Sequence, residues 1–229
     1  MKASVVVFPG SNCDRDVAVA LRNISGTMPD MVWHGDSSLP NSDLIVLPGG
    51  FSYGDYLRSG AMAVHSPIMK EVMRLADRGT PILGICNGFQ VLTETGLLPG
   101  VLMRNATLKF ICRNLSLRVE RNDTIFSRHY TEKEVITIPI ANHDGNYFAD
   151  QETLNRLENE NRVAFRYTNA HGEADAASNP TGSRNNIAGI YDQSCRILGL
   201  MPHPERVSEE LLGGLDGKPL FESLLEVLH

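Results

Sequence analysis

The chain has 229 residues, of which 42% are apolar and 21% are charged, and its formal net charge is −6. This length suits one sizeable α/β domain, and a composition close to the globular average excludes a disordered or fibrous protein. An acidic balance without any Lys/Arg cluster argues against a nucleic-acid partner.

The apolar runs are too short to cross or target a membrane. No run reaches the roughly 18 apolar residues of a membrane span, and the run at residues 5–9 is shorter than a signal peptide requires. The four cysteines lie far apart without a Cys-x-x-Cys motif, which argues against a structural zinc site and a disulfide framework. We therefore expect a soluble cytoplasmic protein with reduced thiols, no membrane partner and no bound metal.

The first hundred residues alternate short apolar runs with longer amphipathic stretches. Buried strands are predicted at residues 5–8, 44–47 and 81–85, and a helix over residues 67–76 is stopped by the Gly-Thr-Pro at residues 79–81. Strands separated by helices are typical of βα units around a largely parallel sheet.

Beyond Gly100 apolar and polar residues alternate, as in antiparallel strands. Such strands are predicted at residues 115–119, 135–138 and 163–167, followed by a hairpin of residues 187–191 and 196–200 and a closing helix near residues 221–228. The predicted fold is α/β: a single domain over residues 1–229, with a mainly parallel open sheet flanked by helices and additional antiparallel strands.

The sharpest chemical motif is Gly-Ile-Cys-Asn-Gly at residues 84–88, where an apolar strand runs directly into a helical stretch at residues 89–95. Such a strand-to-helix elbow exposes its central side chain, and small flanking residues relieve crowding of the backbone. Cys86 would lie beside a helix N-terminus, which favours the thiolate. The motif predicts a nucleophile; the alternative is a buried cysteine that closes a strand.

A base with its own orienting carboxylate is predicted in Met-Pro-His-Pro-Glu-Arg at residues 201–206. The prolines on both sides of His203 favour an extended segment, in which residues two apart point to the same side. Glu205 could then hold one imidazole nitrogen of His203 while the other faces Cys86, as in acyl-transfer enzymes. The alternative is a surface His and Glu in a proline-rich loop.

A third element is Leu-Pro-Gly-Gly-Phe at residues 47–51, where another strand runs into glycines. The backbone N–H groups of Gly50 and Asn87 could bind the oxyanion of a tetrahedral intermediate, although a plain tight turn is an equal alternative. Among the other residues of chemical interest, Asp14 is expected to cap a helix, while Cys112 and Cys195 are expected to be small core residues.

These motifs resemble those of the class I glutamine amidotransferases, and within that class those of the glutaminase subunits of phosphoribosylformylglycinamidine synthase, an enzyme of purine biosynthesis. The resemblance spans nearly the whole chain, through residues 7–14, 48–58, 84–90, 179–183 and 201–206. The elbow and the His-Pro-Glu motif identify the class, and residues 51–58 narrow it to this subunit. The resemblance implies a flavodoxin-like, glutamine amidotransferase type 1 domain.

The same resemblance implies a γ-glutamyl thioester on Cys86, with His203 as general base and acid and Glu205 orienting it. Gly50 and Asn87 would form the oxyanion hole, and Gln90 would contact the substrate glutamine. Ammonia would pass to a separate synthetase subunit that uses ATP and Mg²⁺ to make formylglycinamidine ribonucleotide, in a complex with a third, still smaller subunit. No cofactor is expected on this chain itself.

One segment departs from the family pattern. Where the family reads Pro-Ile-Ala-His-Gly-Glu-Gly, residues 139–145 read Pro-Ile-Ala-Asn-His-Asp-Gly. The segment remains polar, so Asn142 and His143 are retained as candidate substrate-binding residues.

Two other classes of protein fit parts of this pattern. A stand-alone cysteine hydrolase would share the elbow but generally lacks a late His-x-Glu. A non-catalytic interaction subunit would share the fold, yet the presence of Cys86, His203 and Glu205 together argues against it.

Overall fold

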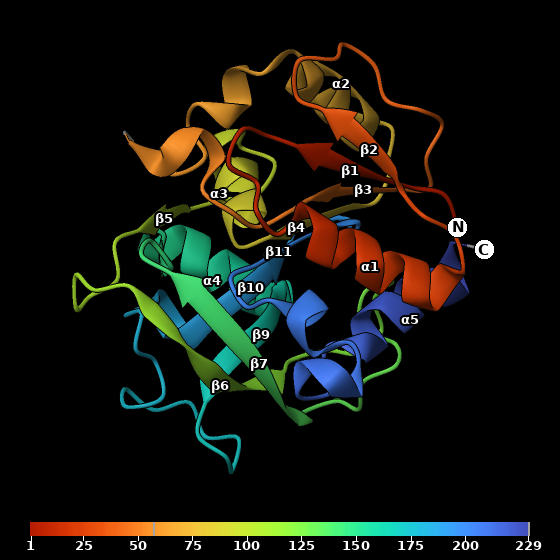
Figure 1. Ribbon diagram of the computed structural model, residues 1–229. Helices are drawn as coiled ribbons and strands as arrows, with labels where there is room; N and C mark the ends of the chain where they lie inside the picture. Colours follow the sequence, from red (N-terminus) through yellow and green to blue (C-terminus); the bar gives the residue numbers. More distant parts are fainter. Residues whose placement is uncertain (57, 229) are drawn as a thin grey trace.

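A single nine-stranded sheet dominates the described part of the chain, in the order β2-β1-β3-β4-β11-β10-β9-β6-β7 (Figure 1). The computed structural model describes residues 1–56 and 58–228, so Leu57 of the 51–58 motif and the C-terminal His229 lie outside the described residues. The first five strands of this order, β2, β1, β3, β4 and β11, run parallel to one another. From β11 onward, through β10, β9, β6 and β7, each strand is antiparallel to the one before it. The strands are β1 (Ala3–Val7), β2 (Asp30–Trp33), β3 (Leu44–Leu47), β4 (Ile82–Ile85), β6 (Ile111–Val119), β7 (Val135–Asn142), β9 (Val163–Thr168), β10 (Ile187–Tyr191) and β11 (Ile197–Leu200), with β5 (Val101–Met103) and β8 (Asn146–Phe148) paired separately.

Burial explains the two sequence patterns. Strands β3 and β4 are uniformly apolar apart from Gly84 because all their residues are buried, which is the pattern of parallel strands covered on both faces. Strand β7 alternates exposed and buried residues at its start, as an antiparallel strand with one solvated face does. The predicted fold class, including its antiparallel second half, is confirmed.

Five α-helices cover the described part of the sheet. They are α1 (Asp14–Ser25), α2 (Pro67–Asp77), α3 (Asn87–Glu94), α4 (Gln151–Asn159) and α5 (Lys218–Val227). Helix α1 packs on β1 and α5, while α3 packs against β3, β4 and β11. Local chemistry sets some of their ends: Gly26 closes α1 in the left-handed conformation at φ 73°, and the Asp150 side chain accepts a hydrogen bond from Thr153 N–H at the start of α4.

Strands β3, β4 and β11 lie side by side and run in the same direction. Their carboxyl ends therefore meet at one edge of the sheet, where the crevices of open α/β sheets bind ligands. The strands deliver Gly49–Gly50, Cys86 and the segment that begins at Met201 to this edge, although these residues lie far apart in the sequence.

Some sequence expectations were wrong or incomplete. Asp14 is the first residue of α1 and not its cap, because Cys13 occupies the N-cap position. Cys112 is exposed on β6 and Cys195 is half-buried in the β10–β11 turn, so neither is a core residue. The sequence analysis did not identify α4 or the edge strand β2, whose burial pattern is mostly exposed.

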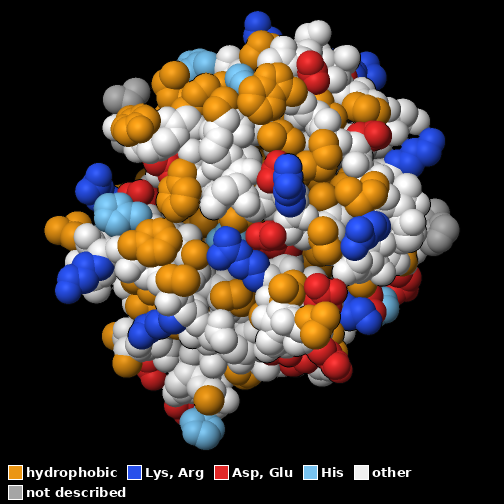
Figure 2. All heavy atoms as spheres, in the orientation of Figure 1, with side chains coloured by type: hydrophobic (Ala, Val, Ile, Leu, Met, Phe, Trp, Pro, Cys, Tyr) orange, Lys and Arg blue, Asp and Glu red, His pale blue; other side chains and the backbone are white. Residues whose placement is uncertain are grey.

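The surface carries both signs of charge. On the face drawn in Figure 2, Lys and Arg side chains are scattered among acidic and apolar ones. None of the helices in the described residues has the length and hydropathy needed to cross a bilayer.

Candidate active site

Cys86 occupies a strained elbow between β4 and α3. Its backbone adopts φ 49° and ψ −102°, a region that non-glycine residues rarely occupy and that clusters at functional sites. The Cys86 N–H donates to the Leu200 carbonyl at 2.7 Å, which ties the elbow to the end of β11. A Cβ on Gly88 would lie 1.9 Å from the Leu47 carbonyl oxygen, and one on Gly84 would lie 2.4 Å from Leu92 Cδ1, so close packing explains both glycines.

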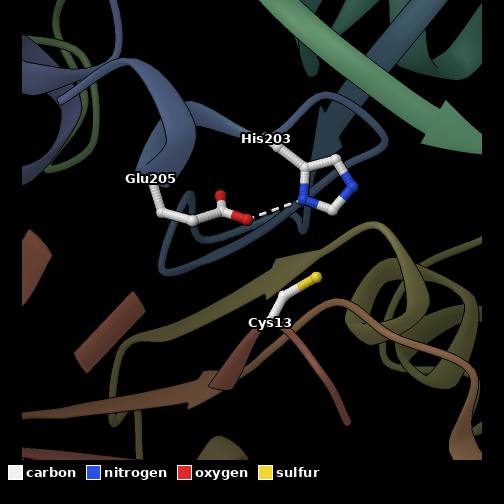
Figure 3. Close-up of side chains that lie close together, drawn as sticks. All are labelled: Cys13, His203 and Glu205. Carbon is white, nitrogen blue, oxygen red and sulfur yellow. Dashed lines mark hydrogen bonds and ion pairs between the residues drawn. The ribbon is translucent and has the colours of Figure 1, made fainter. Parts of the chain in front are cut away.

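His203 and Glu205 form a buried pair at the end of β11. The Nδ1 of His203 and the Oε1 of Glu205 lie 2.6 Å apart, and the two side chains are 1% and 0% exposed. The His203 N–H donates to the Pro139 carbonyl at 2.8 Å, which fixes the backbone of the segment against β7. Figure 3 shows the carboxylate directed at this ring nitrogen.

The expected extended geometry of this segment is correct only at His203, whose φ is −108° and ψ is 83°. Residues Pro204–Val207 form a 3-10 helix with the proline in its first turn. Proline suits that position because the backbone N–H that it lacks would have no partner within the helix there. Glu205 therefore reaches the imidazole from a helical turn and not along a strand.

The charge state of His203 follows from its neighbours. Burial alone would lower its pKa, but the Glu205 carboxylate and Cys86 together outweigh it and raise the pKa from 6.5 to about 10. The imidazole is thus held protonated by a carboxylate on one side. Its Nε2 makes no hydrogen bond of normal geometry with a described residue, but Cys86 lies close enough to raise the pKa of the ring through its charge and a weak hydrogen bond, so this nitrogen is available to a reacting group.

The predicted oxyanion donors lie at the same edge. Gly50 follows β3 with φ 144°, and Asn87 is the first residue of α3. Neither backbone N–H donates to another described residue. The loop that carries Gly50 is held by the Phe51 N–H, which donates to the Gly10 carbonyl at 2.9 Å.

A cavity of about 220 Å³ opens beside the thiol. It is lined by Gly50, Phe51, Gly54, Asp55, Cys86, Gln90, Arg104, Ala141, Asn142, His143 and Asp144. All three predicted substrate-binding residues, Gln90, Asn142 and His143, therefore line it. This is the space in which a substrate would meet Cys86.

The three substrate-binding candidates differ in their hydrogen bonding. The Gln90 amide donates to the Asp144 carbonyl at 2.8 Å and accepts from the Asn87 side chain at 2.8 Å, so it braces the cavity wall. Asn142 is 3% exposed, and both of its amide atoms are buried without a partner among the described residues. Buried amides are normally hydrogen-bonded, so Asn142 keeps an unused donor and an unused acceptor at the cavity wall.

Cys13 is a neighbour that the sequence analysis assigned no role. Its Sγ and the ligand atoms of His203 and Glu205 all lie within 4.8 Å of one another (Figure 3), and Arg206 Nη2 donates to this sulfur at 3.0 Å. Burial, with the charge of Glu205, raises the pKa of Cys13 to about 12 against the opposing effect of Arg206, so the thiol stays neutral. These three donors could be arranged around a metal, but the Arg206 cation at the sulfur disfavours one. The one feature of the sequence that could have placed Cys13 near the site is its position directly after the first strand of a parallel sheet.

Comparison with known proteins identifies the family. Residues 1–213 match the model of the CobB/CobQ-like glutamine amidotransferase domain. The chain is 57% identical over 229 residues to the phosphoribosylformylglycinamidine synthase subunit PurQ of Zymomonas mobilis, with 100% of both chains covered. The chain belongs to the PurQ family of glutamine amidotransferases. The resemblance inferred from the motifs is thereby confirmed.

Solved structures agree with this assignment. A chain in the structure of PurLQS from Thermotoga maritima superposes on this PurQ-family chain with a TM-score of 0.87 and 46% identity, covering 100% of this chain and 99% of that chain. The glutaminase domain of Trypanosoma brucei CTPS has a TM-score of 0.59 at 15% identity, covering 100% of this chain and 93% of the other, and shows the shared fold alone.

Proposed function

We propose that this chain is the glutaminase subunit of a phosphoribosylformylglycinamidine synthase, built as one glutamine amidotransferase domain over residues 1–229. It hydrolyses glutamine at Cys86 and passes the ammonia to a synthetase subunit. The observation that carries the proposal is the meeting of the Cys86 elbow with the buried His203–Glu205 pair at the ends of two adjacent parallel strands. Its PurQ relatives, which match along their full length, support the identity of the complex.

The first half of the reaction forms a thioester. The Cys86 thiolate attacks the amide carbon of glutamine, a C–S bond forms, and the oxygen charge is received by the N–H groups of Gly50 and Asn87. As the C–N bond breaks, His203 gives its Nε2 proton to the departing nitrogen, which leaves as ammonia. A histidine held protonated by Glu205 is suited to this acid role.

The second half returns the enzyme to its starting state. His203, now neutral, takes a proton from water at Nε2 while the water oxygen bonds to the thioester carbon. The C–S bond then breaks and releases glutamate and the Cys86 thiolate. Throughout, Glu205 holds Nδ1 and keeps Nε2 directed at the reacting atoms.

The partners follow from this chemistry. Ammonia is the only product that a synthetase needs from this chain, so ATP and Mg²⁺ would be bound by the synthetase subunit and not here. The similarity to a chain of PurLQS supports a synthetase partner, and we extend the proposal to a third small subunit. We also place the complex in the cytoplasm, in keeping with the free thiols of Cys13, Cys86, Cys112 and Cys195.

The test uses the assembled complex and two nitrogen sources. Cys86→Ala should abolish amidine formation from glutamine but leave formation from added ammonia intact, because the synthetase does not need the thiol when ammonia is supplied. Cys112→Ala, which removes an exposed thiol from β6, is the matched control and should retain both activities. Loss of both activities in Cys86→Ala would mean that the cysteine is structural.

A further inference from the structure

Residues 51–58 are the motif that narrows the family to the PurQ type, yet the mechanism uses none of their side chains. The segment begins with a turn in which Tyr53, Gly54 and Asp55 all have positive φ, at 54°, 76° and 49°. A left-handed backbone disfavours Tyr and Asp, so such a turn persists only where its surroundings hold it. What holds the turn bears on Gly50, the proposed oxyanion donor just before it in the chain.

The backbone of this turn is bonded to the loop that follows β1. The Phe51 N–H donates to the Gly10 carbonyl at 2.9 Å, and the Tyr53 N–H donates to the Pro9 carbonyl at 2.7 Å. Gly50 packs closely on the same loop, because a Cβ there would lie 2.6 Å from the Gly10 carbonyl oxygen. A displacement of Tyr53 would therefore change how Gly50 lies against this loop.

The direction of the Gly50 N–H is set only in part by its own peptide group. The Gly49 carbonyl of that peptide accepts a hydrogen bond from the Cys13 N–H at 3.3 Å. Because C=O and N–H point in opposite directions across a trans peptide, this bond turns the Gly50 N–H away from Cys13. The bond is long, and glycines on both sides of the peptide let it rotate easily, so the rest of the restraint must come from the turn.

The Tyr53 side chain fixes the turn through three mutual hydrogen-bonding contacts. Its hydroxyl oxygen lies 2.8 Å from His34 Nδ1 and 2.9 Å from Ser66 Oγ, and these two atoms are 3.2 Å apart. The rings of His34 and Tyr53 also meet edge to face, with 5.4 Å between their centroids. Tyr53, His34 and Ser66 together form the Tyr53 network.

Two members of the Tyr53 network are fixed independently of the active site. His34 follows β2 beside the start of α2 (Figure 1): its N–H donates to the Val7 carbonyl at 2.9 Å, and its carbonyl accepts from the Ile68 N–H at 3.2 Å. Ser66 is the N-cap residue of α2, where serine is favoured because its hydroxyl can cap the helix. Here the hydroxyl makes no capping bond and contacts Tyr53 and His34 instead, so the helix forgoes a stabilising interaction.

We infer that Tyr53 is a positioning residue for the oxyanion hole: its network holds the strained turn in place and thereby keeps the Gly50 N–H directed at the cavity beside Cys86. The cavity wall includes Gly50, but Tyr53 is not among the described residues that line it, so Tyr53 acts through the backbone. In the same turn the Ser52 N–H donates to the Asn87 side-chain oxygen at 3.3 Å, which links the turn to the second donor residue. The inference rests on the proposed glutaminase function and adds a residue that sets its rate.

The experiment removes one hydroxyl from the turn and keeps the aromatic ring. The assembled complex is assayed with glutamine as wild type, as Tyr53→Phe and as Tyr56→Phe, a control in which the lost hydroxyl belongs to a tyrosine that is 91% exposed. Tyr53→Phe should lower kcat about 5- to 50-fold, less than the roughly 10²- to 10³-fold cost of a lost oxyanion donor, because Gly50 is displaced and not removed. KM should stay within about twofold, since no substrate contact is changed. Tyr56→Phe should match wild type.

Two further measurements separate positioning from general support of the fold. Alkylation of Cys86 by iodoacetamide forms no oxyanion, so its rate in Tyr53→Phe should stay within about twofold of wild type. In an enzyme that already carries Gly50→Ala, Tyr53→Phe should lower kcat by less than about a further twofold, because residues that act through one group do not have additive effects.

A third measurement observes the amide directly and needs no turnover. In the isotope-labelled full chain, the NMR resonance of the Gly50 amide should move in Tyr53→Phe and stay in place in Tyr56→Phe. Ser66→Ala, which removes a hydroxyl that does not cap α2, should move the same resonance.

The inference can fail in distinct ways. Wild-type kcat in Tyr53→Phe, or an unmoved Gly50 resonance, would overturn it. Equal losses of kcat and of the Cys86 alkylation rate, or a full additional loss in the Gly50→Ala enzyme, would mean that Tyr53 only supports the fold. A wild-type complex that is inactive with glutamine would refute the proposed function, while a shifted Gly50 resonance in Tyr53→Phe would still support the positioning of Gly50 by Tyr53.

Discussion

Replacing Glu205 by glutamine isolates the contribution of one buried charge to the reaction. The carboxylate lies 2.6 Å from His203 Nδ1, and both side chains are withdrawn from solvent. Hydrogen bonds to a charged group contribute about 1.5–3 kcal/mol and neutral ones about 0.5–1.5 kcal/mol. If glutamine keeps its carbonyl oxygen toward Nδ1, the difference of about 1–2 kcal/mol predicts a 5- to 30-fold lower kcat.

The second carboxylate oxygen adds an effect on stability. Glu205 Oε2 is buried without a hydrogen bond among the described residues, so the amide NH₂ of glutamine would occupy that place unsatisfied. An unsatisfied buried donor costs about 1–3 kcal/mol of the free energy of unfolding. If the amide turned its NH₂ toward His203 instead, the ring would be forced into the wrong tautomer, and the loss of kcat would approach about 10⁴-fold.

The assay is glutamine-dependent turnover of the assembled complex over a range of pH, with urea denaturation of the same variant. Because the Glu205 carboxylate raises the pKa of His203, Glu205→Gln should also shift the pH profile downward. Glu210→Gln, which changes an exposed carboxylate in the neighbouring 3-10 helix, should match wild type. A Glu205→Gln enzyme with wild-type kcat and an unshifted pH profile would refute the orienting role.

Three further outcomes are expected. Gly50→Ala would place a Cβ 2.6 Å from the Gly10 carbonyl oxygen at φ 144°, so displacement of one oxyanion donor should lower kcat about 10²- to 10³-fold in the same turnover assay. Gly88→Ala would place a Cβ 1.9 Å from the Leu47 carbonyl oxygen and should lower the free energy of unfolding, measured in urea, by at least about 1–3 kcal/mol; Gly96→Ala, with φ 76° but open space, controls for strain alone. The pKa of His203 is raised on folding from 6.5 to about 10, so its stabilising contribution is complete below the unfolded value and is lost as pH rises through about 10. Urea unfolding should therefore show a steeper loss of stability across this range in wild type than in Glu205→Gln, and parallel curves would contradict the proposed ion pair.

The strand ends were predictable from the sequence because their signals are local. Residues 44–47 and 81–85 are continuous apolar runs, a pattern that indicates burial on both faces of the sheet. The glycines that follow or interrupt these runs mark where the backbone turns sharply or packs closely. The elbow at Cys86 is only partly local in origin, since Gly84 is crowded by Leu92 within the same strand-turn-helix unit, whereas Gly88 is crowded by Leu47 of the neighbouring strand β3.

The errors in the sequence analysis arose where a residue's environment depends on distant segments. The side on which Cys112 points depends on what covers each face of β6, and the shape of the segment after His203 depends on its hydrogen bond to Pro139. Prolines restrict φ without choosing between an extended chain and the first turn of a helix.

The sequence by itself predicted the candidate nucleophile, the candidate base and its carboxylate, and it determined the parallel half of the sheet. The tertiary structure alone decided that β11 lies beside β4 with the same direction, which brings His203 to Cys86, and that Cys13 and Asp55 enter the same region. Periodicity and turn residues encode local conformation, whereas strand order is set by the packing of the complete core, to which residues remote in the chain contribute together.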